Sequence, residues 1–498
     1  MEKTKKLLCL VIAVCFTFSA IITSNAALPT TNHSKPYEIK AYFIGGYQPD
    51  NAYKVMEAAD KYLKKKINAS IKFTVFDFTD YPNKMSAKCA ANERFDIMFT
   101  ANWTGDVEYN TCVSKGYIIP LNGLMDKYAS KTKAALGSTI IRSCSIGGKL
   151  YAIPVLKEMA HNYQLIYRAD VAKELKLNMS KIKTLADAEN AFIKVKKNKP
   201  GMHPYQLVAG ESLYKVLDFE KINGDDCPGA IYSPAAGKKG AAATKVVNDY
   251  GTPEAMKLFK LMNKWYKQGI IRKNGKNTNF LTDLALGKTF SVIQSGKPGK
   301  AAELAHQTKR PLASVNITPV IANAYDSGTS SMMAVSKTSE DPVRALEFLE
   351  LLNTDKYLNN LMVFGLEGEH YQFVNREKGI IKLIGEGYAR SSNGWSQGNQ
   401  YLNYVTNTED PEKWTKIKKY NNSALHSPLP YFIYNPKAVK TRITKLTAVK
   451  KQYVPMLEAG KGDPAKYVII MTAKFKASGL DKVLADMQKQ VDKLLAKR

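Results

Sequence analysis

The chain has 498 residues, of which 45% are hydrophobic, 23% charged and 10% aromatic. This composition supports a large core and excludes wholesale disorder, and the length corresponds to about three domains or to two large lobes. After residue 30 no apolar run approaches the ~20 residues that a membrane span needs, which excludes a multi-pass membrane protein.

The first 26 residues have the features of a secretory signal peptide. A lysine-rich start precedes an apolar stretch from Leu7 to Ile22, and small residues around Ala26 predict cleavage after that residue. Cys15 follows Val14, where lipoprotein signals carry a small residue, so a lipid anchor is the less favoured alternative, as is an uncleaved membrane anchor. Cleavage, a lipid anchor and an uncleaved anchor all predict that the folded part lies outside the cytoplasm, in the extracellular space or at the cell surface.

The formal net charge is +29, and lysine supplies most of the 73 basic residues. Nucleic-acid recognition usually relies on arginine forks, whereas lysine is a solvated point charge. Together with the export signal, this favours a surface attracted to an anionic cell envelope, and no nucleic-acid partner is predicted.

Four cysteines remain after the predicted cleavage. None of their spacings is C-x-x-C, so a zinc or redox site is unsupported. Export permits disulfides, but three complete pairings are open and the spacing does not say whether any of them forms. The four are Cys89, Cys112, Cys144 and Cys227.

The mature chain starts with alternating strands and helices. Residues 39–43 alternate as a strand, residues 53–67 have helical apolar spacing, and residues 71–75 alternate again. The stretch 94–99 is more continuously apolar, as is typical of a strand inside a parallel sheet. This order predicts an α/β sheet with helices on its faces.

The remaining chain is rich in predicted helices with short strands between them. An extended segment at 151–155 and a strand at 164–167 precede a helix from Asp170. Helical spacing returns at 254–268, and Asp341-Pro342 is a typical start for the next helix, with a capping carboxylate and a proline in the first turn. Finally, an amphipathic helix is predicted over 480–495.

Motifs for catalysis or metal binding are weak. Gly394 to Gly398 matches G-x-S-x-G around Ser396, but residues 389–393 are too polar for the buried strand that a nucleophile elbow needs. The run from Glu367 to His370 is better explained as a solvated loop than as a metal or acid–base site. No metal or cofactor is predicted.

Two tryptophans lie among small and amide residues. Trp103 directly follows the apolar stretch 94–99, and Trp395 lies in the polar loop 392–400. Sugar sites need flat aromatic side chains beside Asn, Gln, Asp and Glu. Because ligands bind at the carboxyl ends of strands in open α/β sheets, ligand contact is as well supported for Trp103 and Trp395 as a packing role.

Three segments resemble the extracellular solute-binding proteins of bacterial ABC importers. FDIMFTANWTGDVEYNTCVSKGYIIPLNGLMDKY (95–128) is similar to the third strand and its ligand loop, and residues 147–175 and 330–374 resemble the crossings between the lobes. GLEGEHY and WSQGNQYLNY are similar to the oligosaccharide-binding subgroup, which often consists of lipoproteins with an extra carboxy-terminal domain. The missing lipid signal departs from that pattern.

The resemblance implies an α/β fold of two lobes, a periplasmic-binding-protein-like clamp with crossover hinge strands. The first lobe is expected to contain residues 37–153 and 288–335. The second is expected to contain residues 154–287 and 336–498, including a helical carboxy-terminal extension. Closure on a ligand would present the closed form to a membrane permease.

In this family the ligand lies in the groove between the lobes. Aromatic residues there are expected to stack on sugar rings, and amides and a carboxylate to bond hydroxyls. For Glu158 and Gln294 a hinge-side hydrogen bond is an equal alternative. The predicted groove residues are Asn102, Trp103, Glu158, Gln294, Tyr325, Trp395 and Asn399.

The resemblance therefore implies a non-enzymatic protein that captures a carbohydrate, with an oligosaccharide favoured, and delivers it to ABC permease subunits. Three alternatives stay open. A secreted glycan hydrolase would use two carboxylates or Ser396, and a solute-binding protein for peptides or anions would use the positive charge. A polyanion adhesin would bind through the lysines near the carboxy terminus.

Overall fold

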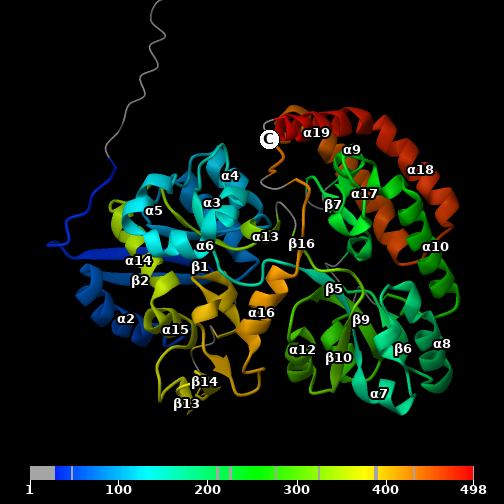
Figure 1. Cartoon of the computed structure of the whole chain (residues 1–498), viewed down its shortest axis with the longest axis horizontal. Coiled ribbons are helices and arrows are strands. Elements are labelled where there is room, and N and C mark those ends of the chain that lie inside the picture. The colour runs from blue at the N-terminus through cyan, green and yellow to red at the C-terminus, as the bar shows by residue number, and fades with distance from the viewer. Residues whose placement is uncertain are drawn as a thin grey trace, which may run out of the picture.

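The computed structural model describes residues 28–496, apart from 46–48, 209–211, 224–226, 275–277, 323–325, 386–387, 389–390 and 430–431. The predicted signal peptide and Tyr325 lie outside the described residues. The chain forms two lobes side by side, each with its own β-sheet (Figure 1). The predicted α/β clamp of two lobes is therefore confirmed.

The first lobe is built on a five-stranded sheet in the order β2-β1-β3-β12-β4. β1 runs parallel to β2 and β3, with Ile39 opposite Ile71 and Ala41 opposite Ile97, whereas β12 is antiparallel to β3 and β4. The three parallel strands end at the same edge of the sheet. The strands are β1 (Tyr37–Ile44), β2 (Ala69–Phe76), β3 (Ile97–Thr100), β4 (Ala152–Pro154) and β12 (Met332–Val335).

Helices from two separate parts of the chain pack around this sheet. Leu346 and Leu349 on α14 are fully buried in the same apolar core as Ile39 on β1 and Val55 on α2. The helices are α2 (Ala52–Ile67), α3 (Asp80–Ala90), α4 (Tyr109–Ser114), α5 (Asn122–Tyr128), α6 (Ser130–Ser143), α14 (Pro342–Thr354) and α15 (Lys356–Phe364). The predicted start of α14 is correct, because the Asp341 carboxylate accepts from the backbone N–H of Arg344 at 2.9 Å.

The second lobe is built on a four-stranded sheet in the order β10-β5-β9-β6. β5 lies antiparallel to both β10 and β9, and β9 is parallel to β6. The strands are β5 (Asn162–Arg168), β6 (His203–Gln206), β9 (Thr289–Gly296) and β10 (Leu312–Asn316), and β7 (Phe219–Lys221) pairs with β8 (Ala230–Tyr232) nearby.

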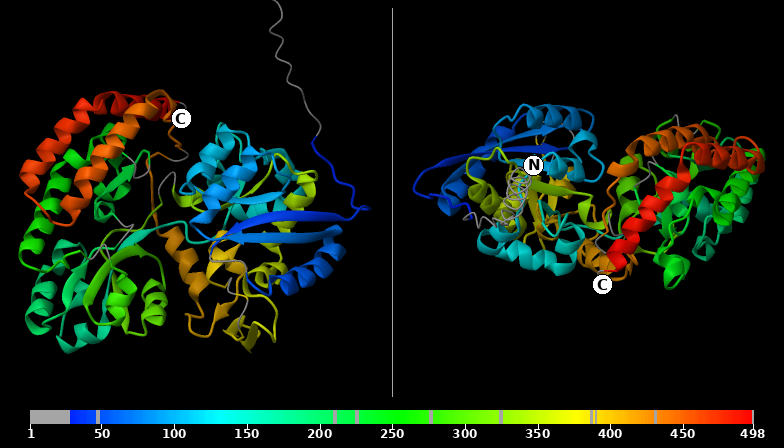
Figure 2. Two further views of the ribbon diagram at one scale, coloured as in Figure 1. Left: turned by 180° about the vertical axis from the view of Figure 1, so that it is seen from behind. Right: turned by 90° about the horizontal axis from the view of Figure 1, so that it is seen from above.

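The carboxy-terminal helices α17, α18 and α19 cover the second lobe only (Figure 2). Their buried residues share an apolar core with Tyr214, Phe219, Tyr250 and Phe259. The helices of this lobe are α7 (Ala169–Glu174), α8 (Glu189–Asn198), α9 (Ala241–Thr244), α10 (Pro253–Lys267), α11 (Phe280–Ala285), α12 (Lys300–Thr308), α17 (Lys440–Glu458), α18 (Pro464–Ala477) and α19 (Leu480–Leu495).

The lobe boundaries differ from the predicted ones in two places. Residues 288–316 were expected in the first lobe, but β9 and β10 flank β5 in the second sheet. Residues 336–364 were expected in the second lobe, but α14 and α15 complete the core of the first lobe. The physical reason is that an apolar pattern shows that a strand or helix is buried, but it does not distinguish one sheet from another.

Three segments cross between the lobes. The crossings contain the described residues 155–161, 317–322 with 326–331, and 423–428, and the last two pair through β11 (Ile321–Ala322) and β16 (Leu425–His426), which are parallel. α16 (Lys413–Asn422) precedes the third crossing, and Figure 1 shows it between the lobes. A small sheet of β13 (Tyr371–Asn375), β14 (Ile380–Leu383) and β15 (Val405–Thr406) lies on the first-lobe side.

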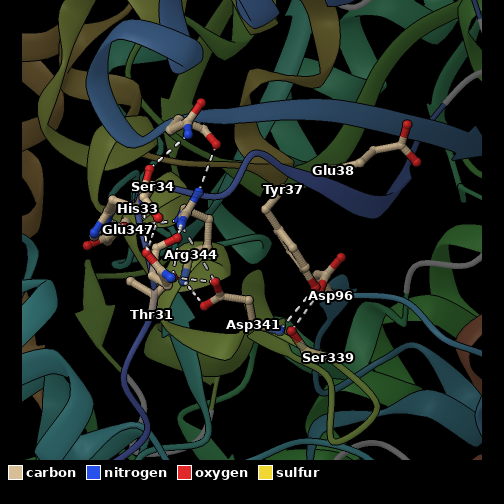
Figure 3. A network of polar contacts seen from close by, with 12 residues as sticks. Thr31, His33, Ser34, Tyr37, Glu38, Asp96, Ser339, Asp341, Arg344 and Glu347 are labelled. Atoms are coloured by element: carbon tan, nitrogen blue, oxygen red, sulfur yellow. Dashed lines mark hydrogen bonds and ion pairs between the residues drawn. The ribbon is translucent and has the colours of Figure 1, made fainter.

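The segment that follows the predicted signal peptide is fixed to the first lobe by a network of polar contacts (Figure 3). The guanidinium of Arg344, which is fully buried, donates to the Asn68 carbonyl oxygen at 2.8 Å and to the Thr31 hydroxyl at 3.0 Å. The His33 imidazole lies 2.8 Å from a Glu347 carboxylate oxygen. α14 therefore holds the start of the folded chain.

The four mature cysteines are free thiols, and all four are buried. Burial raises the pKa of Cys89 to about 11 and that of Cys112 to about 12, which makes both thiols poor nucleophiles. Among the described residues, no helix is long and apolar enough to span a bilayer.

Candidate functional site

Aromatic side chains gather at the edge of the first sheet where the parallel strands end. Phe78 follows β2, Trp103 follows β3, and Trp395 comes from a short 3-10 helix far along the chain (Ser391–Ser396). The ring centroids lie 6.0 Å apart for Trp103 and Trp395, 6.0 Å for Phe78 and Trp395, and 6.3 Å for Phe78 and Trp103. We call these three residues the aromatic platform.

Two members of the aromatic platform are exposed although they are large and apolar, and Trp395 is half-buried. Phe78 is 49% exposed and Trp103 is 46% exposed, whereas Phe99 beneath them is fully buried. The Phe99 ring contacts both indoles, at centroid distances of 5.9 Å to Trp103 and 5.8 Å to Trp395. A rigid apolar surface that faces solvent at the end of a sheet is suited to stacking on a flat ligand.

Two consecutive serines hold the tryptophans in place. The indole N–H of Trp103 donates to the Ser330 carbonyl oxygen at 2.8 Å, and the Ser331 hydroxyl donates to the Trp395 carbonyl oxygen at 2.7 Å. Ser330 and Ser331 end the second crossing between the lobes. The platform is therefore attached to a segment that must move if the lobes close.

A cavity of about 360 Å³ lies beside the crossings, and one of its lining residues, Ser330, accepts the hydrogen bond from the Trp103 indole. One wall comes from the first crossing and the start of β5, and another comes from the end of β9 and the start of α12. Its lining residues are Lys157, Glu158, Met159, Ala160, His161, Tyr163, Ser295, Gly296, Lys297, Lys300 and Ser330.

Glu158 is the predicted site residue that lies in this cavity. Its carboxylate oxygen is 3.6 Å from Lys297 Nζ and 3.8 Å from Lys157 Nζ. Burial acts to raise the pKa of Glu158, but the positive charges of the two lysines outweigh it, so the pKa is lowered. Glu158 is therefore a charged acceptor on the wall of the cavity.

Of the predicted site residues Asn102 and Tyr325, the structure describes only Asn102. Asn102 is half-buried next to Trp103, and its backbone N–H donates to the Thr329 carbonyl oxygen at 2.9 Å, so it lies at the edge of the platform. Tyr325 is outside the described residues, and its expected role stays a prediction.

Gln294 and Asn399 are near the site but do not line the cavity. Gln294 is buried on β9, and the residue after it, Ser295, lines the cavity instead. The Asn399 amide donates to the Asn353 carbonyl oxygen at 3.2 Å, and its side-chain oxygen accepts from the Tyr401 backbone N–H at 3.0 Å. These hydrogen bonds anchor the loop that contains Asn399 to α14.

Two further residues of the site were not predicted. Phe78 follows β2 as Trp103 follows β3, so the rule that ligands bind at the carboxyl ends of strands would have identified it. Asn421 on α16 holds the first crossing: its oxygen accepts from the backbone N–H groups of Met159 and Ala160 at 2.9 and 3.1 Å, and its amide donates to the Lys157 carbonyl oxygen at 2.9 Å. No sequence signal distinguishes this asparagine from its neighbours.

The weak catalytic motifs have structural explanations. Ser396 is fully buried and ends a 3-10 helix, not the strand–turn–helix of a nucleophile elbow. His370 is buried, and its Nδ1 accepts from the Leu366 backbone N–H at 2.8 Å. Within the described part of the chain, no group of three or more His, Cys, Asp or Glu side chains could hold a metal ion.

Comparison with known proteins agrees with this architecture. The chain is similar to a carbohydrate ABC transporter substrate-binding protein of Streptococcus pneumoniae serotype 4, with 26% identity over 479 residues, 95% of this chain and 94% of that protein. It is also similar to the crystal structure of the N-glycan transport solute binding protein of Streptococcus pneumoniae, with a TM-score of 0.82 and 26% identity over 93% of this chain and 99% of that one.

The same streptococcal protein in complex with Man5GlcNAc gives a TM-score of 0.71, again at 26% identity, covering 93% of this chain and 99% of that one. Residues 428–496 match a domain of unknown function. Residues 57–365, more than half of the chain, match the family described as bacterial extracellular solute-binding protein. The chain therefore belongs to the family of bacterial extracellular solute-binding proteins.

Proposed function

We propose that this protein captures an oligosaccharide on the aromatic platform and in the adjoining cavity, and delivers it to the permease of a carbohydrate ABC importer. The observation that carries the proposal is the cluster of exposed Phe78 and Trp103 with half-buried Trp395 at the carboxyl edge of the first sheet. Sugar rings have apolar C–H faces that stack on such rings, while Glu158 and Asn102 can bond hydroxyl groups.

The second part of the proposal is that the lobes close on the ligand. The TM-score to the streptococcal N-glycan transport protein falls from 0.82 to 0.71 for its complex with Man5GlcNAc, although the identity is the same. A different relative placement of two rigid lobes would have this effect. The ligand would shift an open–closed equilibrium by contacting both lobes at once, and the permease would engage the closed form.

The similarity to that protein makes a mannose- and N-acetylglucosamine-containing oligosaccharide the first ligand to test. Binding is proposed to occur without turnover. The platform supplies a stacking surface and the cavity supplies hydrogen-bonding groups, and capture of a ligand by these contacts requires no bond cleavage. The protein would act outside the cytoplasmic membrane, with its positive surface facing an anionic cell envelope.

Calorimetric titration of the mature protein with Man5GlcNAc tests the proposal, followed by recovery of the ligand from the complex. Binding with an intact ligand supports capture for transport. Ligand at about 100 times its dissociation constant would also add roughly 2.7 kcal/mol to the free energy of unfolding, seen as a few degrees in the melting temperature. Recovery of shortened sugars would instead show hydrolysis.

The same titration with variants tests the site. Trp103→Ala and Trp395→Ala should each weaken sugar binding about tenfold or more, since each removes a stacking ring. Tyr53→Ala is the matched control, because Tyr53 is 55% exposed on α2 of the same lobe and lies outside the platform and the cavity. Unchanged affinity in both tryptophan variants would disprove the assignment of the platform as the ligand site.

A further inference from the structure

The cavity wall formed by the first crossing and by the second-lobe segments that follow β9 is positively charged. Three lysines line it against one glutamate: Lys157 comes from the first crossing, Lys297 follows β9, and Lys300 begins α12. We propose that this wall selects an oligosaccharide that carries an anionic group, a carboxylate or a phosphate. This inference rests on the proposed function, since it adds a charge to the ligand of the same groove.

The contacts of these lysines leave positive charge to be neutralised. Glu158 is shared, because the same oxygen, Oε1, lies 3.8 Å from Lys157 Nζ and 3.6 Å from Lys297 Nζ. Both distances exceed the ~2.7–2.9 Å of a charge-assisted hydrogen bond. Lys157 also donates to the Glu158 carbonyl oxygen, but only at 3.4 Å. Two ammonium groups therefore face one carboxylate that bonds neither of them closely.

Glu303 on α12 supplies a second carboxylate, but mainly to a different lysine. Its oxygens lie 2.8 Å from Lys300 Nζ and 3.7 Å from Lys297 Nζ. Lys300 is thus closely paired, whereas Lys297 lies between two carboxylates at 3.6 and 3.7 Å. Lys297 is the ammonium group best placed to turn toward a ligand.

Burial strengthens the interactions between these charges. The side chains of Lys157 and Glu158 are only 12% and 19% exposed, and that of Lys297 is 30% exposed, so solvent screens their charges less than it does on the open surface. Burial acts to lower the pKa of Lys297, but the neighbouring carboxylates raise it, so the ammonium stays charged at neutral pH. Lys413 adds a further positive charge that lowers the pKa of Glu158.

The position of the charge relative to the platform defines the expected ligand. Ser330 lines the cavity and its carbonyl oxygen accepts the indole N–H of Trp103, so the cavity that the lysines line and the platform share Ser330 as a direct neighbour. A sugar ring on the platform would leave the next residue of the oligosaccharide near the cavity. The anionic group is therefore expected on a sugar next to the stacked one.

Three matched probes test this inference by calorimetric titration at low salt: neutral Man5GlcNAc, the same glycan with one terminal mannose oxidised to a uronate, and the same glycan with a 6-phosphate. One or both charged glycans should bind about tenfold more tightly than the neutral glycan, as one charge-assisted hydrogen bond predicts. The arm that gains affinity identifies carboxylate or phosphate as the group recognised. The gain should shrink as salt is raised, while neutral binding should change little.

Variants then assign the preference to the wall. Lys297→Gln should abolish the difference in affinity between the charged and the neutral glycan, and Lys297→Arg should retain it. Glu158→Gln should strengthen binding of the charged glycan, because it removes the carboxylate that competes for the lysines. Lys257→Gln, on the exposed side of α10, is the matched control and should behave as wild type. Melting temperatures without ligand show that each variant is folded.

Failure of this inference differs from failure of the proposed function. Equal or tighter binding of the neutral glycan overturns the anionic preference and leaves sugar capture in place. A preference that survives in Lys297→Gln overturns the assignment to this wall. If none of the three glycans binds, the proposed function itself fails.

Discussion

The ring centroids of Trp103 and Trp395 lie 6.0 Å apart, with the ring planes inclined by 43°, although the two residues come from distant parts of the chain. Trp103 follows a strand of the first sheet, and Trp395 belongs to the segment that returns to the first lobe after the second crossing. Both rings rest on Phe99, which is fully buried. The aromatic platform therefore depends on the packing of two chain segments that are distant in the sequence.

The first prediction concerns the coupling of these two rings. Trp103→Ala and Trp395→Ala should each lower the free energy of unfolding, and the double variant should lose less than the sum, by about 0.5–1.5 kcal/mol, because the first truncation already removes the contact. Urea unfolding of the four proteins without ligand measures this cycle. Additive losses would show that the rings do not support one another.

The second prediction concerns Asn421 at the first crossing. Asn421→Ala removes hydrogen bonds to the backbone at Lys157, Met159 and Ala160, and should lower the free energy of unfolding by about 1–3 kcal/mol. Hydrogen exchange of residues 157–160 should also become faster. Asn422→Ala is the control, since the next residue is exposed, and comparable destabilisation in both variants would contradict this role.

The third prediction concerns the start of the mature chain. Arg344→Leu should cost about 3–5 kcal/mol, because the substitution removes a fully buried cation and leaves its partners unpaired. Exchange of the amides of residues 28–35 should accelerate in the same variant. Arg376→Leu serves as the control, since the Arg376 side chain is 67% exposed and pairs with Glu367 on the surface. Slow exchange in the Arg344 variant would mean that other contacts hold the segment.

The fourth prediction concerns acid stability. Hydrogen bonds from Lys40 and Lys88, each at 2.8 Å, lower the pKa of Glu93 from 4.5 to about 2. A carboxyl whose pKa is lower in the folded state contributes stability above pH 4.5 and loses it as the pH falls toward 2. Glu93→Gln should therefore be less stable than wild type at pH 7, and the difference should shrink between pH 4.5 and 2.

Urea unfolding at several pH values tests this prediction. Glu412→Gln is the control, because the Glu412 side chain is 74% exposed and lies 3.8 Å from its lysine partner. A stability difference for the Glu93 variant that is the same at pH 7 and pH 2 would show that the two lysines do not act through its charge.

Much of the fold followed from local patterns. The strand at 39–43 and the helix at 53–67 appear as β1 and α2, because the burial of alternating or helically spaced residues is a local property of the chain. The local patterns did not show to which lobe residues 288–316 and 336–364 belong. β9 is buried along almost its whole length, so its residues suit either sheet, and only the pairing with β5 decides.

The site was predictable where a residue type and a sheet edge coincide. Trp103 satisfied both conditions, and the structure brings it together with Trp395, although their contact with a ligand stays a prediction. Asn399 has the residue type of a sugar ligand, but its side chain bonds the backbone of Asn353 and Tyr401. Only the folded chain reveals which polar side chains are already engaged.

The fifth prediction concerns the cysteines, whose pairing the sequence left open. The structure has four buried free thiols, and burial raises the pKa of Cys144 to about 12. Because a thiolate is the reactive form and these thiols are shielded, an aromatic disulfide reagent should label none of them in the native protein and all four after unfolding. A reducing agent should leave the melting temperature unchanged. A drop of several degrees under reduction, or fewer than four thiols in the unfolded chain, would show that a disulfide forms after export.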